Sequence, residues 1–302
     1  MGDAGPVDDM THRLLLDVSS LTYRAYFAVR DGMFTADGMA IQAAHGYLDM
    51  VARLAATRRP DEIVHVYDHD WRPVARTDIY AGYKANRPDE PEDLTPQFEL
   101  IRELLDLTGM PQAQTRGWEA EDAIGAFCID ARENDRLEIV SGDRDLLQLV
   151  RDPVVTVLFT VRGVSELHTF DEAAVLEKYG VPASRYVEFA ILRGDPSDEL
   201  PGVKGVGEKT ARDLVVAFDS IDAMLASAAA GDLAIKPAIR QRLLESASYL
   251  ADMQRLVPVN GDAPLEIWAG ERDDAALTEL GERYAIRGPV QRILAALDAA
   301  AR

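Results

Sequence analysis

The chain has 302 residues, which is enough for one large domain or two domains of ordinary size. Its single cysteine, Cys128, excludes an internal disulfide, and an N-terminus without a basic-then-apolar leader predicts a cytoplasmic protein that does not enter a membrane. The net charge of −20 argues against nucleic acid binding over the whole surface, so such a function needs a local basic region.

Short apolar runs alternate with helical patterns in the first 180 residues. Four runs have the composition of buried strands in a parallel sheet: residues 13–20, 61–68, 136–145 and 154–161. Apolar residues recur at helical spacing in residues 41–56 and 96–109. This alternation predicts a doubly wound α/β domain. After about residue 180 the strand pattern is lost, and Ala-rich helical segments predict a mostly helical second region.

Acidic residues stand at or just past the predicted strand ends: Asp17, Asp68, Asp143 and Asp145. Because sites in open α/β sheets form beyond the C-terminal strand ends, we expect these side chains at one rim. Each aspartate alone is typical of a turn or a helix cap. Their coincidence instead predicts a cation site, and oxygen-only ligands favour Mg²⁺ or Mn²⁺ over zinc.

The stretch "GWEAEDAIG" (117–125) adds three carboxylates at the predicted start of the helix before the third strand. Acidic residues in a first turn also complement the helix dipole, which is the ordinary interpretation. Helical spacing places Glu119 and Asp122 on one face, whereas Glu121 is expected to point to the side.

A basic segment, "HDWRPVARTDIYAGYKANRP" (69–88), follows Asp68 in this acidic chain. It interleaves cations with aromatic residues, namely Arg72, Arg76, Lys84 and Arg87 with Trp71, Tyr80 and Tyr83. This composition suits the phosphates and stacked bases of a single strand, and a solvated helix with snorkelling cations is the alternative. Lys84 and Arg87 are three apart and are expected to share a helical face.

The glycine-rich stretch "GDPSDELPGVKGVGEKTARDLV" (194–215) superficially resembles a phosphate loop. Glu208 stands where that loop needs its lysine, and no strand pattern precedes it, so a P-loop is excluded. The pattern predicts a tight hairpin between two helices, whose N–H groups hold a DNA phosphate beside Lys204 and Lys209. Asp195 and Asp198 are expected to extend the carboxylate cluster.

These motifs, together with "LLLDVSSLTYRAYFAV" and "IVSGDRDLLQLV", resemble the bacterial flap endonuclease / 5′-3′ exonuclease family nearly end to end. The resemblance implies a PIN-like nuclease core at residues 11–180 with a basic helical arch at about 70–95. It implies a helical region at 181–302 with a helix–hairpin–helix motif at about 194–216. No polymerase region follows, so we expect a stand-alone homologue of the 5′-nuclease domain of DNA polymerase I.

The resemblance also implies residue roles. Metal ligands would be Asp17, Asp68, Glu119, Glu121, Asp122, Asp143, Asp145, Asp195 and Asp198. Catalytic roles would fall to Lys84, Arg87, Asp143 and Asp145. DNA contacts would come from Tyr23, Arg24, Arg76, Tyr80, Tyr83, Lys84, Arg87, Gly202, Lys204, Gly205, Gly207 and Lys209, with K⁺ as a candidate ion at the hairpin. The chain departs from the family at Glu121, where Asp is usual, at Glu199, where Asn is usual, and at Tyr67, where Phe is usual.

The expected function is a monomeric, structure-specific 5′ nuclease of replication and repair. It would hydrolyse DNA at 5′ flaps, nicks and 5′ ends with two or more Mg²⁺ or Mn²⁺ ions. Two alternatives remain open: a catalytically silent DNA-junction binder, and another acidic-site metal-dependent ribonuclease or phosphatase.

Overall fold

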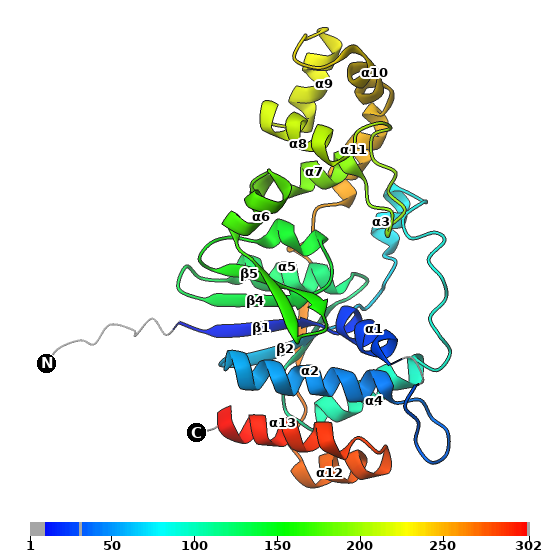
Figure 1. Ribbon diagram of the computed structural model, residues 1–302, viewed down its shortest axis with the longest axis vertical. Helices are drawn as coiled ribbons and strands as arrows, with labels where there is room; N and C mark the ends of the chain where they lie inside the picture. Colours follow the sequence, from blue (N-terminus) through cyan, green and yellow to red (C-terminus); the bar gives the residue numbers. More distant parts are fainter. Residues whose placement is uncertain (1–9, 30–31, 301–302) are drawn as a thin grey trace, which may run out of the picture.

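The computed structural model of the protein describes residues 10–29 and 32–300. The N-terminal stretch that lacks a leader pattern therefore lies outside the described residues, apart from Met10. A seven-stranded sheet in the order β6-β5-β4-β1-β2-β3-β7 forms the centre of the molecule (Figure 1). Its strands are β1 (His12–Asp17), β2 (Glu62–Val66), β3 (Gln112–Thr115), β4 (Arg136–Ser141), β5 (Val155–Arg162), β6 (Glu166–Phe170) and β7 (Leu265–Trp268).

The five central strands are parallel, and the edge strands β6 and β7 are antiparallel to their neighbours. The four apolar runs are confirmed as β1, β2, β4 and β5, and the α/β class is confirmed with a mixed rather than a purely parallel sheet. The expectation of no strand beyond residue 180 is wrong, because β7 pairs with β3. An edge strand of four residues with exposed and half-buried side chains lacks the apolar run of a buried strand.

Alternate side chains of β1 divide the core into two layers. Leu14 and Leu16 face one cluster and Leu15 faces the other, because successive strand side chains point to opposite faces. The first cluster includes side chains of α1 (Val18–Ala28), α2 (Gln42–Arg58), α4 (Thr95–Asp106), α12 (Asp274–Arg283) and α13 (Arg287–Ala300). The second includes side chains of α5 (Ala120–Asp130), α6 (Glu172–Tyr179) and α7 (Tyr186–Arg193).

The second cluster continues into a helical end of the molecule, as predicted (Figure 1). This end contains α8 (Glu208–Ala217), α9 (Ile221–Ala229), α10 (Pro237–Glu245) and α11 (Ala247–Leu256), and α3 (Val74–Ile79) packs against α11. Two short 3₁₀ helices, η1 (Asp145–Leu149) and η2 (Ala183–Arg185), lie between the sheet and this end. The chain then returns to the sheet through β7, and α13 packs against α2. Within residues 10–29 and 32–300, no helix has the length and apolarity to cross a bilayer.

Candidate functional site

Three aspartates at the C-terminal edge of the sheet each hold a backbone N–H of the following element. Asp17 ends β1 and caps α1 by accepting from Ser20 N at 3.0 Å, and it also accepts from the Ser141 hydroxyl at 2.6 Å. Asp68 follows β2 and accepts from Ala120 N at the start of α5 at 2.7 Å. Asp143 follows β4 and accepts from Asp145 N at 2.9 Å. The structure therefore brings the predicted strand-end carboxylates to one edge.

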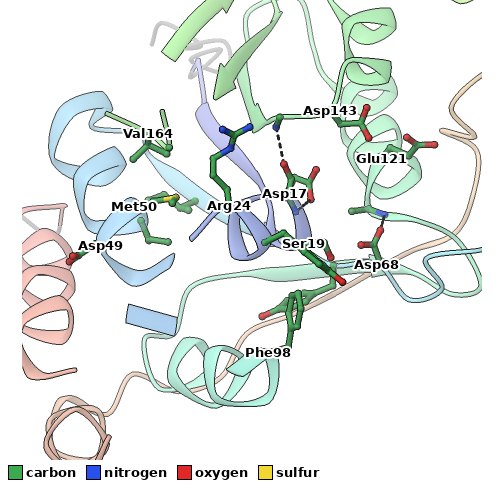
Figure 2. A pocket seen from close by; sticks show the side chains of 18 of the residues that line it. Asp17, Ser19, Arg24, Asp49, Met50, Asp68, Phe98, Glu121, Asp143 and Val164 are labelled. Carbon is green, nitrogen blue, oxygen red and sulfur yellow. Dashed lines mark hydrogen bonds between the residues drawn. The ribbon is translucent and has the colours of Figure 1, made fainter. Parts of the chain in front are cut away.

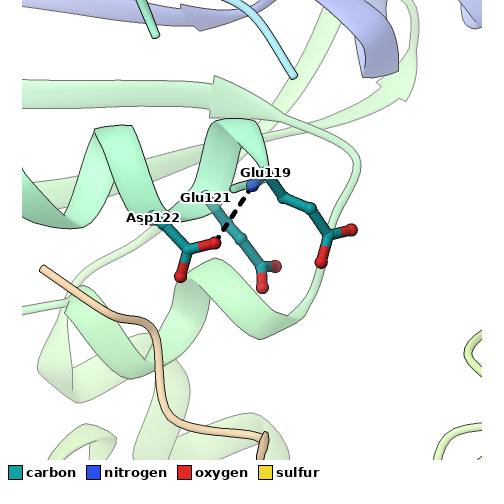
Figure 3. A group of neighbouring side chains, drawn as sticks. All are labelled: Glu119, Glu121 and Asp122. Atoms are coloured by element: carbon teal, nitrogen blue, oxygen red, sulfur yellow. Dashed lines mark hydrogen bonds between the residues drawn. The ribbon is translucent and has the colours of Figure 1, made fainter. Parts of the chain in front are cut away.

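The start of α5 is a capping box made of two carboxylates. Glu119 is the N-cap, and Asp122 accepts a hydrogen bond from its backbone N–H at 3.2 Å (Figure 3). Carboxylate oxygens of Glu119, Glu121 and Asp122 lie within 4.8 Å of one another. The expectation that Glu121 points to the side of Glu119 and Asp122 is wrong, because its carboxylate pairs with the same cation as theirs.

That cation is the Arg76 guanidinium, which α3 supplies. Arg76 pairs with Glu119, with Glu121 at 2.6 Å and with Asp122 at 2.9 Å, and its side chain is only 3% exposed. Its Nε also donates to the Leu256 carbonyl at 3.3 Å. Arg76 was expected to contact DNA, but the buried Glu119 and Asp122 and the half-buried Glu121 enclose it, since a buried charge must be paired.

Lys84 is the second cation of the cluster. Its ammonium pairs with Glu119 and lies 3.7 Å from Asp198, and the residue is 6% exposed. Burial alone would lower the pKa of Lys84, but Glu119 and Asp198 raise it above its usual value. Tyr83 is buried as well, and its hydroxyl donates to Glu119 at 2.7 Å.

The expectation that Lys84 and Arg87 share a helical face is wrong. Residues 81–86 form turns, and Lys84 has a φ of 50°. Arg72 donates to the carbonyls of Tyr83 and Ala81 at 2.7 and 2.9 Å, and thereby occupies acceptors that a helix would need. The predicted helical arch is thus helical only in α3.

Four aspartates from two segments form a second group: Asp143, Asp145, Asp195 and Asp198. Asp195 raises the pKa of the other three, and Asp143 raises those of Asp145 and Asp198. Burial and the neighbouring Asp143 raise the pKa of Asp145 well above its usual value. Burial raises the pKa of Asp198 to about 6, although Lys84 opposes the change. Asp195 is held in its loop by Ser197 N, which donates at 2.8 Å.

Asp17 lines the same cavity as these groups. Burial raises its pKa to about 7, and the neighbouring Asp68 adds to the effect. Figure 2 shows Asp17, Asp68, Glu121 and Asp143 on the same side of a large cavity, which Asp195, Asp198 and Lys84 also line. This crowding of carboxylates, among which Asp17, Asp145 and Asp198 have raised pKa values, fits a divalent ion with oxygen ligands.

The glycine hairpin lies between α7 and α8, as predicted. Gly202 and Gly205 have φ values of 64° and 82°, which disfavour other residues. Gly202 N donates to the Tyr249 hydroxyl at 3.0 Å, and is therefore occupied. Gly207 is the N-cap of α8, and the exposed Lys204 and Lys209 lie on either side of it in the sequence.

Three further predicted DNA contacts are only partly accessible. Tyr23 and Arg24 of α1 line the cavity, where the Tyr23 hydroxyl donates to Glu90 at 3.3 Å and Arg24 donates to the Val161 carbonyl at 3.2 Å. Tyr80 packs edge-on against Tyr249, with 6.1 Å between ring centroids.

Sequence reasoning missed residues that hold these side chains in place. Ser141 bonds Asp17 and accepts from Asp143 N at 2.9 Å, so one hydroxyl joins two strand ends. Glu199 accepts from Asn86 N at 2.8 Å and so ties the turn after Lys84 to the loop of Asp198. Their contacts with Asp17 and Asn86 could not be predicted, because these partners lie 124 and 113 residues away in the sequence.

Comparison with known proteins assigns the family. The model for the 5′-3′ exonuclease N-terminal resolvase-like domain matches residues 12–180, and the model for the 5′-3′ exonuclease C-terminal SAM fold matches residues 181–279. A protein of Streptomyces coelicolor named 5′-3′ exonuclease is 42% identical over 303 residues, with coverage of 95% of this chain and 100% of the relative. A Mycobacterium tuberculosis protein of the same name is 38% identical over 310 residues, with coverage of 94% and 97%.

Solved structures with the same fold have lower identity. T5 5′-exonuclease with bound divalent zinc ions has a TM-score of 0.65 at 19% identity, with coverage of 96% of this chain and 99% of that chain. The catalytic core of Rad2 in complex with DNA substrate has a TM-score of 0.62 at 17% identity, with coverage of 96% and 92%. The sequence matches over both parts of the chain show that the protein is a nuclease that belongs to the 5′-3′ exonuclease family.

Proposed function

We propose that the protein cleaves DNA at 5′ flaps, nicks and 5′ ends in replication and repair, and that it uses Mg²⁺ or Mn²⁺. The observation that carries this proposal is the convergence of carboxylates from both parts of the chain on one cavity. The DNA in the Rad2 complex and the metal ions in the T5 structure support it, because this chain has the same fold.

The residues that would hold the ions are the carboxylates that lack a full complement of cations: Asp17, Asp68, Asp143, Asp145, Asp195 and Asp198. When bound, divalent ions would supply an activated water and would stabilise negative charge on the phosphate. Glu119 and Glu121 line the same cavity and are candidate ligands if Arg76 releases them. Asp122 is completely buried between Arg76 and Asn260 N, so we assign it the positioning of Arg76.

Lys84 would stabilise the charge that develops on the scissile phosphate. Its ammonium is held at the cavity by Glu119 and Asp198, so it can act without reorganising during the reaction. Arg87, which is exposed on the same cavity, would contact the phosphate backbone.

Duplex DNA would bind along the glycine hairpin. The exposed Lys204, Lys209 and N-terminus of α8 can hold backbone phosphates, and K⁺ is a candidate ion at Gly205 and Gly207. Tyr23 and Arg24 would contact the 5′ side of the substrate from α1. Residues 11–180 would then supply most of the ion ligands and Lys84. Residues 181–302 would add Asp195, Asp198 and most of the contacts with the duplex, and a monomer would suffice.

A magnesium-dependent assay on labelled substrates tests this function. We expect cleavage of a 5′-flap DNA and of a nicked duplex, no cleavage of a hairpin RNA, and no cleavage in EDTA. Binding without cleavage in both Mg²⁺ and Mn²⁺ would favour a silent junction binder. Preferred hydrolysis of the RNA would favour an acidic-site ribonuclease.

A further inference from the structure

The three aromatic residues of the basic segment differ in what they can offer to a ligand. Tyr83 is 2% exposed and its hydroxyl is bonded to Glu119. Tyr80 is half-buried against Tyr249. Trp71 is 48% exposed and lines the same cavity as the carboxylates. Of these three rings, Trp71 is the most exposed, and it is the one that lines the cavity.

The environment of Trp71 suits a nucleotide. The Arg87 guanidinium lies over the indole, with 5.9 Å from its Cζ to the ring centroid, and Arg87 lines the cavity as well. A nucleotide presents a flat π face and a phosphate a few ångströms away. An aromatic platform beside an exposed cation matches both groups and is tolerant of base identity.

The backbone around Trp71 is fixed, so its exposure is not that of a loose loop. His69 N and Asp70 N both donate to the Trp118 carbonyl at 3.1 Å. On the other side, Arg72 N donates to Asp70 at 3.0 Å and the Arg72 side chain is bonded to the Tyr83 carbonyl. Trp71 therefore stands three residues after Asp68 on a short rigid segment, and a ligand can use the ring without ordering it first.

A base that stacks on Trp71 must be unpaired or terminal, because the interior of a duplex hides both faces of each base. The nearby carboxylates are where the phosphodiester would react, and Lys84 and Arg87 line the same cavity. We propose that Trp71 is a stacking platform for an unpaired nucleobase of the 5′ single-stranded part of the DNA. This inference rests on the proposed function and adds a specificity-determining contact to it.

The test measures equilibrium binding in EDTA, which prevents divalent-ion-dependent cleavage, with a fluorescently labelled 5′-flap DNA and a blunt duplex of the same sequence. Trp71→Leu keeps an apolar side chain without a π face, and Trp71→Phe keeps a π face. Both changes are at an exposed position and should leave the fold intact. Base–aromatic stacking predicts that Trp71→Leu binds the flap DNA about tenfold more weakly than the wild type does, and that Trp71→Phe keeps most of the wild-type affinity. The affinity for the blunt duplex should differ little among the three proteins.

An abasic-site scan along the 5′ single strand identifies the base. We expect one position at which an abasic site weakens the binding of DNA to the wild type. At that position the abasic site should not weaken binding to the Trp71→Leu variant any further, because both changes remove the same contact. Equal affinity of Trp71→Leu and wild type for the flap DNA would overturn the inference, and so would equal losses on flap and blunt DNA. Cleavage of the flap by the wild type in Mg²⁺ is measured separately, so failure of the stacking contact is distinguishable from failure of the proposed nuclease function.

Discussion

At the scale of single residues, Asp17 shows the electrostatic cost of the site. Its side chain is buried, and its pKa is raised to about 7 by burial and by Asp68. In the unfolded chain an aspartate ionises near pH 3.9, so the folded state holds its proton to higher pH. Ionising Asp17 therefore destabilises the folded state, and the penalty grows as the pH rises from about 4 to about 7.

Asp17→Asn should remove this penalty. In EDTA, the melting temperature of the variant minus that of the wild type should be larger at pH 8 than at pH 5, on the order of a few degrees. The reason is that the side chain at position 17 ionises over this range only in the wild type. Differential scanning fluorimetry at both pH values measures this difference. Since Asn also weakens the contacts to Ser20 and Ser141, the change with pH is the informative quantity, and a difference that is the same at both values contradicts the account.

Lys84 is the second residue with a separable role. It is buried among carboxylates rather than exposed to bulk solvent, so it can contribute little to the capture of DNA. Lys84→Ala should reduce single-turnover cleavage by about 100-fold or more, with little change in the Kd for DNA. Lys209 is exposed, so Lys209→Ala should instead weaken the binding of DNA with little change in the rate of single-turnover cleavage. A Lys84→Ala effect confined to affinity would contradict this division.

At the scale of elements, Arg76 joins three segments that are far apart in the sequence. It lies on α3, it pairs with carboxylates at the start of α5, and it donates to the carbonyl that ends α11. Asn260 N, in the connection to β7, donates to Asp122 at 2.8 Å and completes the junction. The helical end of the molecule is thus attached to the α/β part through a buried ion cluster.

Arg76→Met should destabilise the protein by about 3–5 kcal/mol, because it leaves buried carboxylates without their cation. Arg116→Met is the matched control, since Arg116 pairs with Glu266 at the surface and its side chain is 74% exposed. That variant should lose no more than about 1 kcal/mol. Urea denaturation of both variants gives the comparison, and similar losses in the two would show that the cluster adds no stability.

The sequence predicted the elements and the carboxylates better than the contacts between them. Asp17, Asp68 and Asp143 were found because the ends of parallel strands must meet at one edge. The buried position of Arg76 was not predicted, because its carboxylate partners lie 43 to 46 residues away and local composition does not show which distant residues pair. β3 was missed for a related reason: its sequence is the polar "QAQT", and the burial of Gln112 depends on the Tyr67 hydroxyl, which donates to it at 2.7 Å.

At the scale of the whole molecule, one cavity brings acidic and basic side chains together. The net charge is −20, yet the cavity combines its carboxylates with Lys84, Arg87, Arg24 and Arg193. Residues at the C-terminal edge of the sheet, such as Asp17 and Asp143, line the cavity together with residues 193–198, which directly precede the glycine hairpin. A substrate that spans both parts would place its duplex on the helices and its 5′ strand over the carboxylates.

The carboxylates of the cavity are expected to act in hydrolysis and not in DNA binding. Asp143→Asn removes a charge at the rim of the cavity and leaves the backbone bond to Asp145 possible. Cleavage of a 5′-flap DNA in Mg²⁺ should fall by about 1,000-fold or more, while the Kd in EDTA stays within about threefold. Asp130→Asn, at the exposed end of α5, should behave like wild type in both measurements. Near-normal turnover by Asp143→Asn would contradict the assignment of the site.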